Sequence, residues 1–224
     1  MTKIVHPYAH RLGILRDWKS RWFSDPKKYF NNLKEDIVIR DVISKKMKGH
    51  FISLVEIERS QKATRVIINT SRPGMVIGRQ GEGSQKLRAE IIKNLSKKGI
   101  KVNNEFKLDI VETKNPDSDA AIIAASIVEG LEKRIPFRRV AKQAVEKVSS
   151  QRNVKGVRIV LSGRLGGAEM ARKEEFKKGS IPLQTFRADV DFIRERASLP
   201  YGDIGIKVWV YKGLVFADAD KNVN

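Results

Sequence analysis

The sequence predicts an α+β protein in two parts, and three observations support this fold class. Apolar residues recur at helical spacing in some segments and alternate with polar residues in others, as in mixed helix and strand proteins. The order of the predicted elements changes near residue 115, from interleaved helices and strands to two helices followed by strands. With 224 residues, of which 41% are hydrophobic, the chain is long enough for two folded domains.

The first part, residues 36–114, is expected to run helix, strand, strand, turn, helix, strand. Apolar side chains three and four apart predict the helices, the second of which ends at Gly99. Alternation of apolar and polar residues, rich in β-branched types, predicts the strands. The predicted helices are 36–48 and 82–98, and the predicted strands are 52–60, 65–71 and 106–113.

The second part, residues 115–213, begins at Asn115-Pro116-Asp117, a loop and helix-start signal that we take as the domain boundary. Its first helix is rich in alanine and isoleucine and ends before Pro136, because the residue before a proline disfavours helix. We expect two helices on a mainly antiparallel sheet. The predicted helices are 117–135 and 138–152, and the predicted strands are 157–163, a stretch near 169–177, 188–193 and 204–213.

Residues 1–35 are predicted to form an irregular basic arm, and residues 214–224 a short tail. Cations in the arm, among them Arg11, Lys19 and Arg21, are interleaved with aromatic residues. This composition suits phosphate contact and base stacking, which makes these cations candidate RNA-binding residues. The aromatic residues could equally pack on the protein's own body, and both interpretations stay open.

The charge balance indicates a polyanionic partner. Lysine and arginine number 45 against 26 acidic residues, so the net charge is +19 and the pI is about 10.2. Nucleic acid is the commonest partner of so basic a domain. An anionic membrane is the alternative, but the chain has no lipidation signal and no apolar run of about 20 residues. Since cysteine and a signal-peptide apolar segment are both absent, we expect a cytoplasmic protein.

A glycine turn at Gly78-Arg79-Gln80-Gly81 lies between a strand and a helix and carries the most specific local signal. Glycine lets the backbone turn tightly, and the first N–H groups of the next helix can donate to a phosphate. The spacing from Gly78 is G-x-x-G-x-G, which fits neither the G-x-G-x-x-G of a dinucleotide fold nor a P-loop, and its first part is G-x-x-G. It matches the GXXG loop of a KH domain, which clamps single-stranded nucleic acid. The alternative is a plain turn between helices.

The helix predicted over 138–152 has two chemically distinct sides. On a helical wheel Val140, Ala141, Ala144, Val145 and Val148 fall on one side, which must pack on the protein. Arg138, Arg139 and Lys142 fall on the other side within one turn, with no carboxylate between them. Like charges this close destabilise a helix modestly, so an external anion is expected; a solvated basic face is the alternative.

Three further groups carry weaker signals. Arg164 lies in a glycine-rich segment, 162–167, which suits either close approach to RNA or a tight turn. His6 and His10 are four apart, but Pro7 disfavours the helix that a shared metal would need, so no metal or cofactor is expected. Asp189 and Asp191 could hold Mg²⁺ for RNA hydrolysis, but neighbouring arginines favour ion pairing.

Taken together, these residues resemble small-subunit ribosomal protein three of bacterial type. The matching segments follow one another over nearly the whole chain, and together they are far more specific than any one of them. They are VHP at 5–7, RLGI at 11–14, RPGMVIGRQGE at 72–82, FRRVAKQAV at 137–145, LSGRLGGAEMAR at 161–172, LQTFRADVDF at 183–192 and YGDIGIKVWVYKG at 201–213.

The resemblance implies a type II KH domain followed by a C-terminal α+β domain, in the head of the small ribosomal subunit. It implies binding to ribosomal RNA, contact with head proteins ten and fourteen, and a place lining the channel where messenger RNA enters. The intact F-R-R-x-x-K pattern implies that Arg138, Arg139 and Lys142 grip messenger RNA. The resemblance implies a structural protein and not an enzyme, and since no ATPase motif is present, we expect opening of messenger helices to be passive or driven by translocation. The rivals are a free KH-type regulator of messenger RNA and an RNA-processing enzyme.

Overall fold

The computed structural model describes residues 5–60, 63–100 and 105–216, which belong to two compact units. The first unit is Trp18–Lys114, and the second combines the residues up to Asp17 with those from Asn115 onward. The predicted arm is therefore divided at residue 17 between the two units. Of the predicted tail, residues 217–224 lie outside the described residues.

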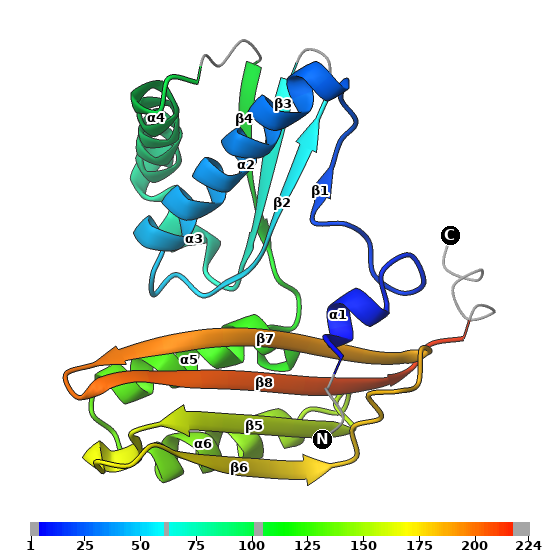
Figure 1. Ribbon diagram of the computed structural model, residues 1–224, viewed down its shortest axis with the longest axis vertical. Helices are drawn as coiled ribbons and strands as arrows, with labels where there is room; N and C mark the ends of the chain where they lie inside the picture. The colour runs from blue at the N-terminus through cyan, green and yellow to red at the C-terminus, as the bar shows by residue number, and fades with distance from the viewer. Residues whose placement is uncertain (1–4, 61–62, 101–104, 217–224) are drawn as a thin grey trace. The chain divides into compact units, whose positions relative to one another are not determined.

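The first unit contains one four-stranded sheet in the order β1-β2-β3-β4 (Figure 1). Strands β2 and β3 are antiparallel, while β1 pairs with β2, and β3 with β4, in parallel. Its elements are β1 (Ser20–Arg21), α2 (Pro26–Lys46), β2 (Ile52–Arg59), β3 (Ala63–Thr70), α3 (Pro73–Ile77), η1 (Arg79–Gly81), α4 (Glu82–Lys97) and β4 (Glu105–Glu112).

A single hydrophobic core joins the helices of the first unit to the sheet. Helix α2 contributes Ile39 and Ile43, helix α4 contributes Ile91, and strands β2 and β3 contribute Ile57 and Ile68, all at most 1% exposed. The apolar spacing that predicted these helices thus corresponds to one buried stripe on each. Because one stripe of each helix is buried, the polar side of each remains available for solvent or a partner.

Helix α2 begins ten residues earlier than predicted, at Pro26 rather than at 36. Its buried side chains start only at Asp36, so the first turns have no apolar stripe for a periodicity argument to detect. The start is nevertheless encoded locally. Asp25 is the N-cap residue, and Pro26 occupies the first helical position, where proline lacks only an N–H that would be unpaired anyway.

A buried polar cluster fastens α2 to the end of β2. Asp36 is 3% exposed, and its carboxylate accepts hydrogen bonds from Arg59 Nε at 3.0 Å, Arg59 Nη2 at 2.6 Å and Trp22 Nε1 at 2.9 Å. Arg59 also pairs with Glu35. A carboxylate this buried is tolerated only when it is paired and hydrogen-bonded. Trp22 therefore packs on the protein itself, as one of the two interpretations of the arm aromatics expects.

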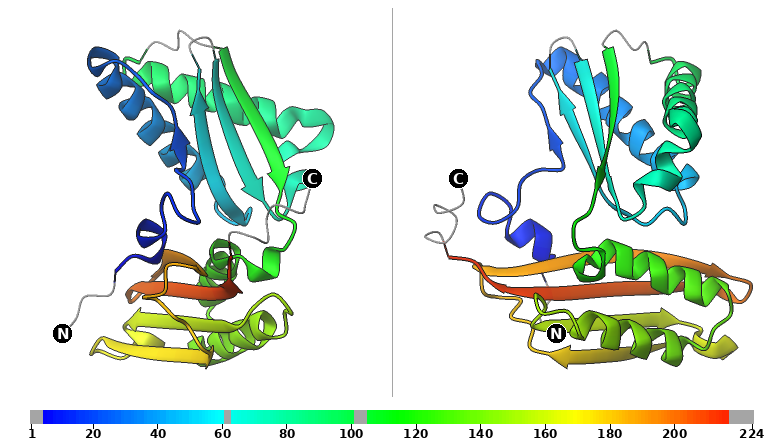
Figure 2. Two further views of the ribbon diagram at one scale, coloured as in Figure 1. Left: turned by 90° about the vertical axis from the view of Figure 1, so that its right-hand side faces the viewer. Right: turned by 180° about the vertical axis from the view of Figure 1, so that it is seen from behind.

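The second unit is two helices on one face of a four-stranded antiparallel sheet, in the strand order β6-β5-β8-β7 (Figure 2). This confirms the predicted α+β class. Its elements are α1 (Pro7–His10), η2 (Pro116–Ser118), α5 (Ala120–Glu132), α6 (Phe137–Ser149), β5 (Gly156–Gly163), η3 (Leu165–Gly167), β6 (Arg172–Gly179), β7 (Ala188–Leu199) and β8 (Gly202–Leu214).

The two faces of this sheet are covered differently. The helix-covered face holds the main core, including Ile127 of α5, Val145 of α6 and Ile206 of β8. The other face, which we call the open face, carries a smaller cluster around Trp209 and Tyr211. Strand β7 continues six residues beyond the predicted end at 193 because charged side chains at 194–196 interrupt its apolar alternation without interrupting its pairing to β8.

The N-terminal segment is attached to the second unit by Arg11, whose side chain is fully buried. Its guanidinium donates to the carbonyl oxygens of Ala188 at 2.5 Å, Pro7 at 3.0 Å and Thr185 at 3.0 Å, and also to those of Pro182 and Leu183. Burial lowers the pKa of this guanidinium, although Asp189 acts in the opposite direction. The prediction that Arg11 contacts RNA is therefore wrong, because its donors are used within the fold.

Replacing Arg59 with methionine should lower the free energy of unfolding of the first unit by about 3–5 kcal/mol, because Asp36 would stay buried without its cation. Chemical denaturation followed by circular dichroism measures the effect. The double variant Asp36→Leu/Arg59→Met removes both charges and should recover part of the loss. An Arg59→Met protein as stable as the parent would show that the pair does not hold α2 to the sheet.

Candidate RNA interface

The glycine turn is built by two helices that approach each other closely. Helix α3 ends at Ile77, and Gly78 and Gly81 adopt positive φ of 70° and 80°. Gln80, at the tip, also has a positive φ of 50°. At Gly83 a Cβ would lie 2.6 Å from the carbonyl oxygen of Val76, so only glycine lets α4 start so close to α3. Sequence reasoning did not single out Gly83, although the G-x-x-G-x-G spacing contains it.

Arg79 and Gln80 are exposed at the tip of this turn, directly before helix α4. The N-cap of α4 is Gly81, and no side chain caps the helix. The N–H of Glu82 donates to the carbonyl oxygen of Arg79, so only the N–H groups that follow it in the first turn of this 16-residue helix can meet an anion, which the helix dipole favours. Together with the Arg79 charge, this arrangement can hold the phosphate backbone of a single strand.

Helix α6 has the predicted two sides. Val140, Ala141, Val145 and Val148 are buried in the core of the second unit. Arg138, Arg139 and Lys142 are exposed on the outer side. The docked side holds the helix rigid, so the three cations form a fixed row.

Within this row, Arg138 is held by the neighbouring strand β6. Its Nε and Nη2 donate to the two oxygens of Glu174 at 3.2 and 3.1 Å, and Arg172 reaches the same carboxylate at 3.3 Å. The hydrogen bond with Arg138 lowers the pKa of Glu174, and the same bond raises the pKa of Arg138. For Arg139 and Lys142 the described part of the chain provides no ion pair. Sequence reasoning missed Glu174, because a contact between α6 and β6 has no local signal.

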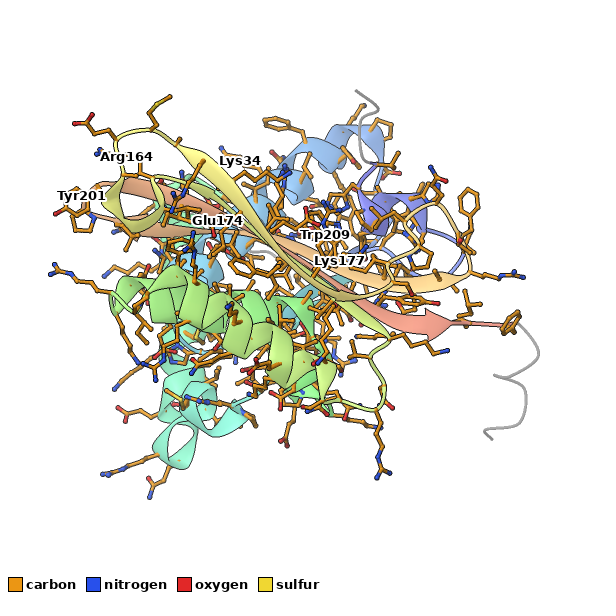
Figure 3. The ribbon with its side chains drawn as sticks, turned by 90° about the horizontal axis from the view of Figure 1, so that it is seen from below. Lys34, Arg164, Glu174, Lys177, Tyr201 and Trp209 are labelled. Atoms are coloured by element: carbon orange, nitrogen blue, oxygen red, sulfur yellow. The ribbon has the colours of Figure 1, made fainter. Side chains whose placement is uncertain are left out.

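Arg164 lies beside a tight turn in which Gly166 and Gly167 have positive φ. Its Nε donates to the carbonyl oxygen of Ala168 at 2.9 Å, and its guanidinium lies 6.0 Å from the ring centre of Tyr201. Figure 3 labels Arg164 and Tyr201 at the same end of the C-terminal sheet. Part of its donor capacity therefore closes the turn, and its contact with RNA stays a prediction.

The remaining arm residues differ in exposure. Arg21 pairs with Glu56 at 3.0 Å and Glu58 at 2.6 Å, while the side chain of Lys19 is exposed. Phe23 and Phe30 are 95% and 70% exposed. These aromatic side chains can stack on a partner, whereas Trp22 cannot do so without leaving its buried cluster.

The two aspartates considered for metal chemistry are engaged by different elements. Asp189 pairs with Arg16 at 2.7 Å, and Asp191 accepts from the backbone N–H of Ala120 at 3.1 Å, at the start of α5. No group of three histidine or acidic side chains that could hold a metal occurs within 5–60, 63–100 and 105–216. Across the same ranges, no helix is both long enough and apolar enough to cross a membrane.

Comparison with known proteins extends over the whole chain. Residues 38–117 match the family model of the KH domain, and residues 127–210 match that of ribosomal protein S3, C-terminal domain. Small ribosomal subunit protein uS3 of Clostridium botulinum strain Okra is 44% identical over 224 residues, covering 100% of this chain and 97% of that protein.

Two further relatives are the uS3 proteins of Clostridium novyi and Clostridium tetani, 42% and 44% identical over 215 residues. Each alignment covers 96% of this chain and 94% of the relative. Identity at this level over almost the full length, with both domains matched in order, shows the family. The chain therefore belongs to the uS3 family of small ribosomal subunit proteins, which is structural and not enzymatic.

Proposed function

We propose that this chain binds ribosomal RNA in the head of the small ribosomal subunit and lines the channel through which messenger RNA enters. The observation that carries the proposal is the row of Arg138, Arg139 and Lys142 on the outer side of α6. In this role the protein works in the cytoplasm as part of the ribosome. It contacts neighbouring head proteins, for which proteins ten and fourteen are the candidates.

The α6 row suits messenger RNA because it can follow a backbone without reading bases. Cations on a docked helix are spaced by the helix itself and attract the phosphates of any sequence. Glu174 lies on β6 and pairs with Arg138, one of the three cations of the row. The row therefore keeps a net positive charge. Opening of messenger helices at this row would be driven by the movement of the ribosome along the messenger.

The GXXG turn supports a second contact with single-stranded RNA, in the first unit. Its exposed Arg79 and Gln80 and the uncapped start of α4 fit a phosphate backbone. The same turn favours the rival function, a free KH-type regulator of messenger RNA. Such a regulator has no need of the α6 row or of the large C-terminal unit, and membership of the uS3 family favours the ribosome.

If the chain is a subunit component, it should cosediment with small ribosomal subunits from cell extracts through a high-salt sucrose gradient. Loosely bound basic proteins leave at high salt because counterions compete for the phosphates. A truncated chain that lacks the second unit serves as the control and should be released. Complete loss of the full chain at high salt would refute the proposal.

Neutralising the α6 row with Arg138→Gln/Arg139→Gln/Lys142→Gln should reduce the slope of log affinity for single-stranded RNA against log salt by about 2, since each phosphate contact contributes roughly 0.7. Lys142→Gln alone should reduce it by about 0.7. The matched control is Lys147→Gln on the same helix, because Lys147 already pairs with Asp117 at 2.7 Å. Equal slopes for all these proteins would exclude the row from RNA binding.

Reversing the charge of the GXXG tip with Arg79→Asp/Gln80→Asp should weaken binding of short single-stranded RNA about tenfold or more, because two carboxylates would replace the phosphate-binding tip. Filter binding or fluorescence anisotropy measures the loss. Ser96→Asp/Lys97→Asp makes the same charge change at the opposite end of α4 and is the control. If both variants bind alike, the loop does not hold RNA.

A further inference from the structure

We infer that a pocket on the open face of the C-terminal sheet binds one unpaired nucleotide of RNA, with the base against aromatic side chains and the phosphate on the surrounding cations. The pocket has a volume of about 250 Å³ and is bordered by the N-terminal segment and by strands β5 to β8. It lies entirely within the second unit, on the sheet face opposite α5 and α6. It is therefore separate from the α6 row.

Two aromatic rings from adjacent strands line the pocket. Phe192 of β7 and Trp209 of β8 are direct register partners, with ring centres 4.9 Å apart and planes inclined by 35°. His6 packs edge-on against Phe192 at 4.8 Å. Trp209 is only 5% exposed, so the partly exposed Phe192 is the ring on which a base can stack, since every base has a flat π-face. The pocket volume is below the roughly 300–1,000 Å³ typical of larger ligands, which favours a single base.

Trp209 also has a donor without a partner. The side chain is 95% buried, as its 5% exposure implies, and its Nε1 has no hydrogen-bond partner among the described residues. A buried N–H that lacks an acceptor costs free energy, and such groups are rare in folded proteins. The atom itself has almost no exposed surface, so this unmet donor belongs to the wall of the pocket and is not a contact offered to a ligand.

Unpaired cations surround these rings. Lys173, Arg194 and Lys207 are exposed, and within the described ranges their side chains make no ion pair or hydrogen bond. Arg194 and Lys207 are direct register partners on β7 and β8, a pairing of like charges that destabilises a sheet. A bound phosphate would turn this repulsion into attraction.

Arg158 also lines the pocket, but unlike the three exposed cations it has an acidic partner. Its guanidinium lies 5.0 Å from the ring centre of Trp209, and it pairs with Glu175 at 2.7 Å. The Glu175 carboxylate is therefore already paired, and the charge of the residues that line the pocket remains positive. Figure 3 labels Trp209 and Lys177 away from the end of the sheet that holds Arg164 and Tyr201. Lys177 is on the same sheet but does not line the pocket, which makes it a suitable control position.

A nucleotide explains the combination of aromatic rings and exposed cations in one pocket better than an acidic peptide or a lipid headgroup does. Either of those would satisfy the cations, but neither brings a flat ring to Phe192. The inference rests on the proposed function only in taking RNA as the partner. It adds an RNA contact on the face of the second unit that lies opposite α6.

The test uses the full chain with Arg138, Arg139 and Lys142 already changed to glutamine, so that the α6 row does not mask the pocket. Two probes are compared, a short oligouridylate and an abasic ribose-phosphate oligomer of the same length. Phe192→Leu should weaken oligouridylate binding about fivefold or more, the loss expected for one stacked base, and should not change binding of the abasic oligomer. Phe192→Tyr keeps the ring and should bind like the parent.

The cations are tested with Arg194→Gln/Lys207→Gln, which should reduce the salt slope by about 0.7 for both probes, because the contact with one phosphate is lost. Lys177→Gln/Lys178→Gln removes the same charge from β6 outside the pocket and should leave the slope unchanged. Circular dichroism melts confirm that each variant is folded.

Three outcomes would overturn the inference. Equal losses on both probes with Phe192→Leu would mean that no base is held, and unchanged binding by every pocket variant would assign the face to a partner other than RNA. An equal loss with the control pair would mean that the charge acts without a site. If the α6 and GXXG variants bind RNA normally while the pocket variants do not, the proposed function fails and the pocket stands. The reverse result rejects the pocket alone.

Discussion

One constraint organises both units: each places its main hydrophobic core on one side of a four-stranded sheet, under helices. Most apolar side chains are buried on that side of the sheet. The cations of a chain with a net charge of +19 must therefore lie on the other surfaces. They gather on the outer side of α6, at the tip of the GXXG turn and on the open face of the C-terminal sheet. The candidate RNA contacts are therefore a consequence of how the cores are built.

The fold could be predicted where burial leaves a periodic pattern. The stripe on α4 and the alternation in β3 identify these elements because each buries one face. Burial does not reach the first ten residues of α2 or residues 194–196 of β7, and the start of α2 and the end of β7 were both missed. Strand β1 is two residues long and pairs in parallel with β2, so nothing local marks it. Strand β1 and the end of β7 are determined by pairing with other strands, which a local pattern cannot express, whereas the start of α2 is marked locally by Asp25 and Pro26.

The residues of the candidate RNA interface were also predictable only where their signal is local. The GXXG turn and the α6 row were predictable because glycine spacing and helical periodicity are local. Contacts between distant segments were not. Glu174 reaches Arg138 from another element, and the Phe192–Trp209 platform depends on the register of β7 against β8. Arg11 was wrongly assigned to RNA because composition cannot distinguish an arginine that meets phosphate from one that meets carbonyl oxygens.

The burial of Arg11 bears on the order in which the chain matures during synthesis. Apart from Pro7, its acceptors lie 171 to 177 residues later in the chain, and the whole of the first unit lies between Arg11 and these acceptors. At typical elongation rates of 5–20 residues per second, the N-terminal segment waits on the order of ten to thirty seconds for its binding site to be made. The first unit can fold in that interval. The segment that leaves the ribosome first is thus among the last to dock.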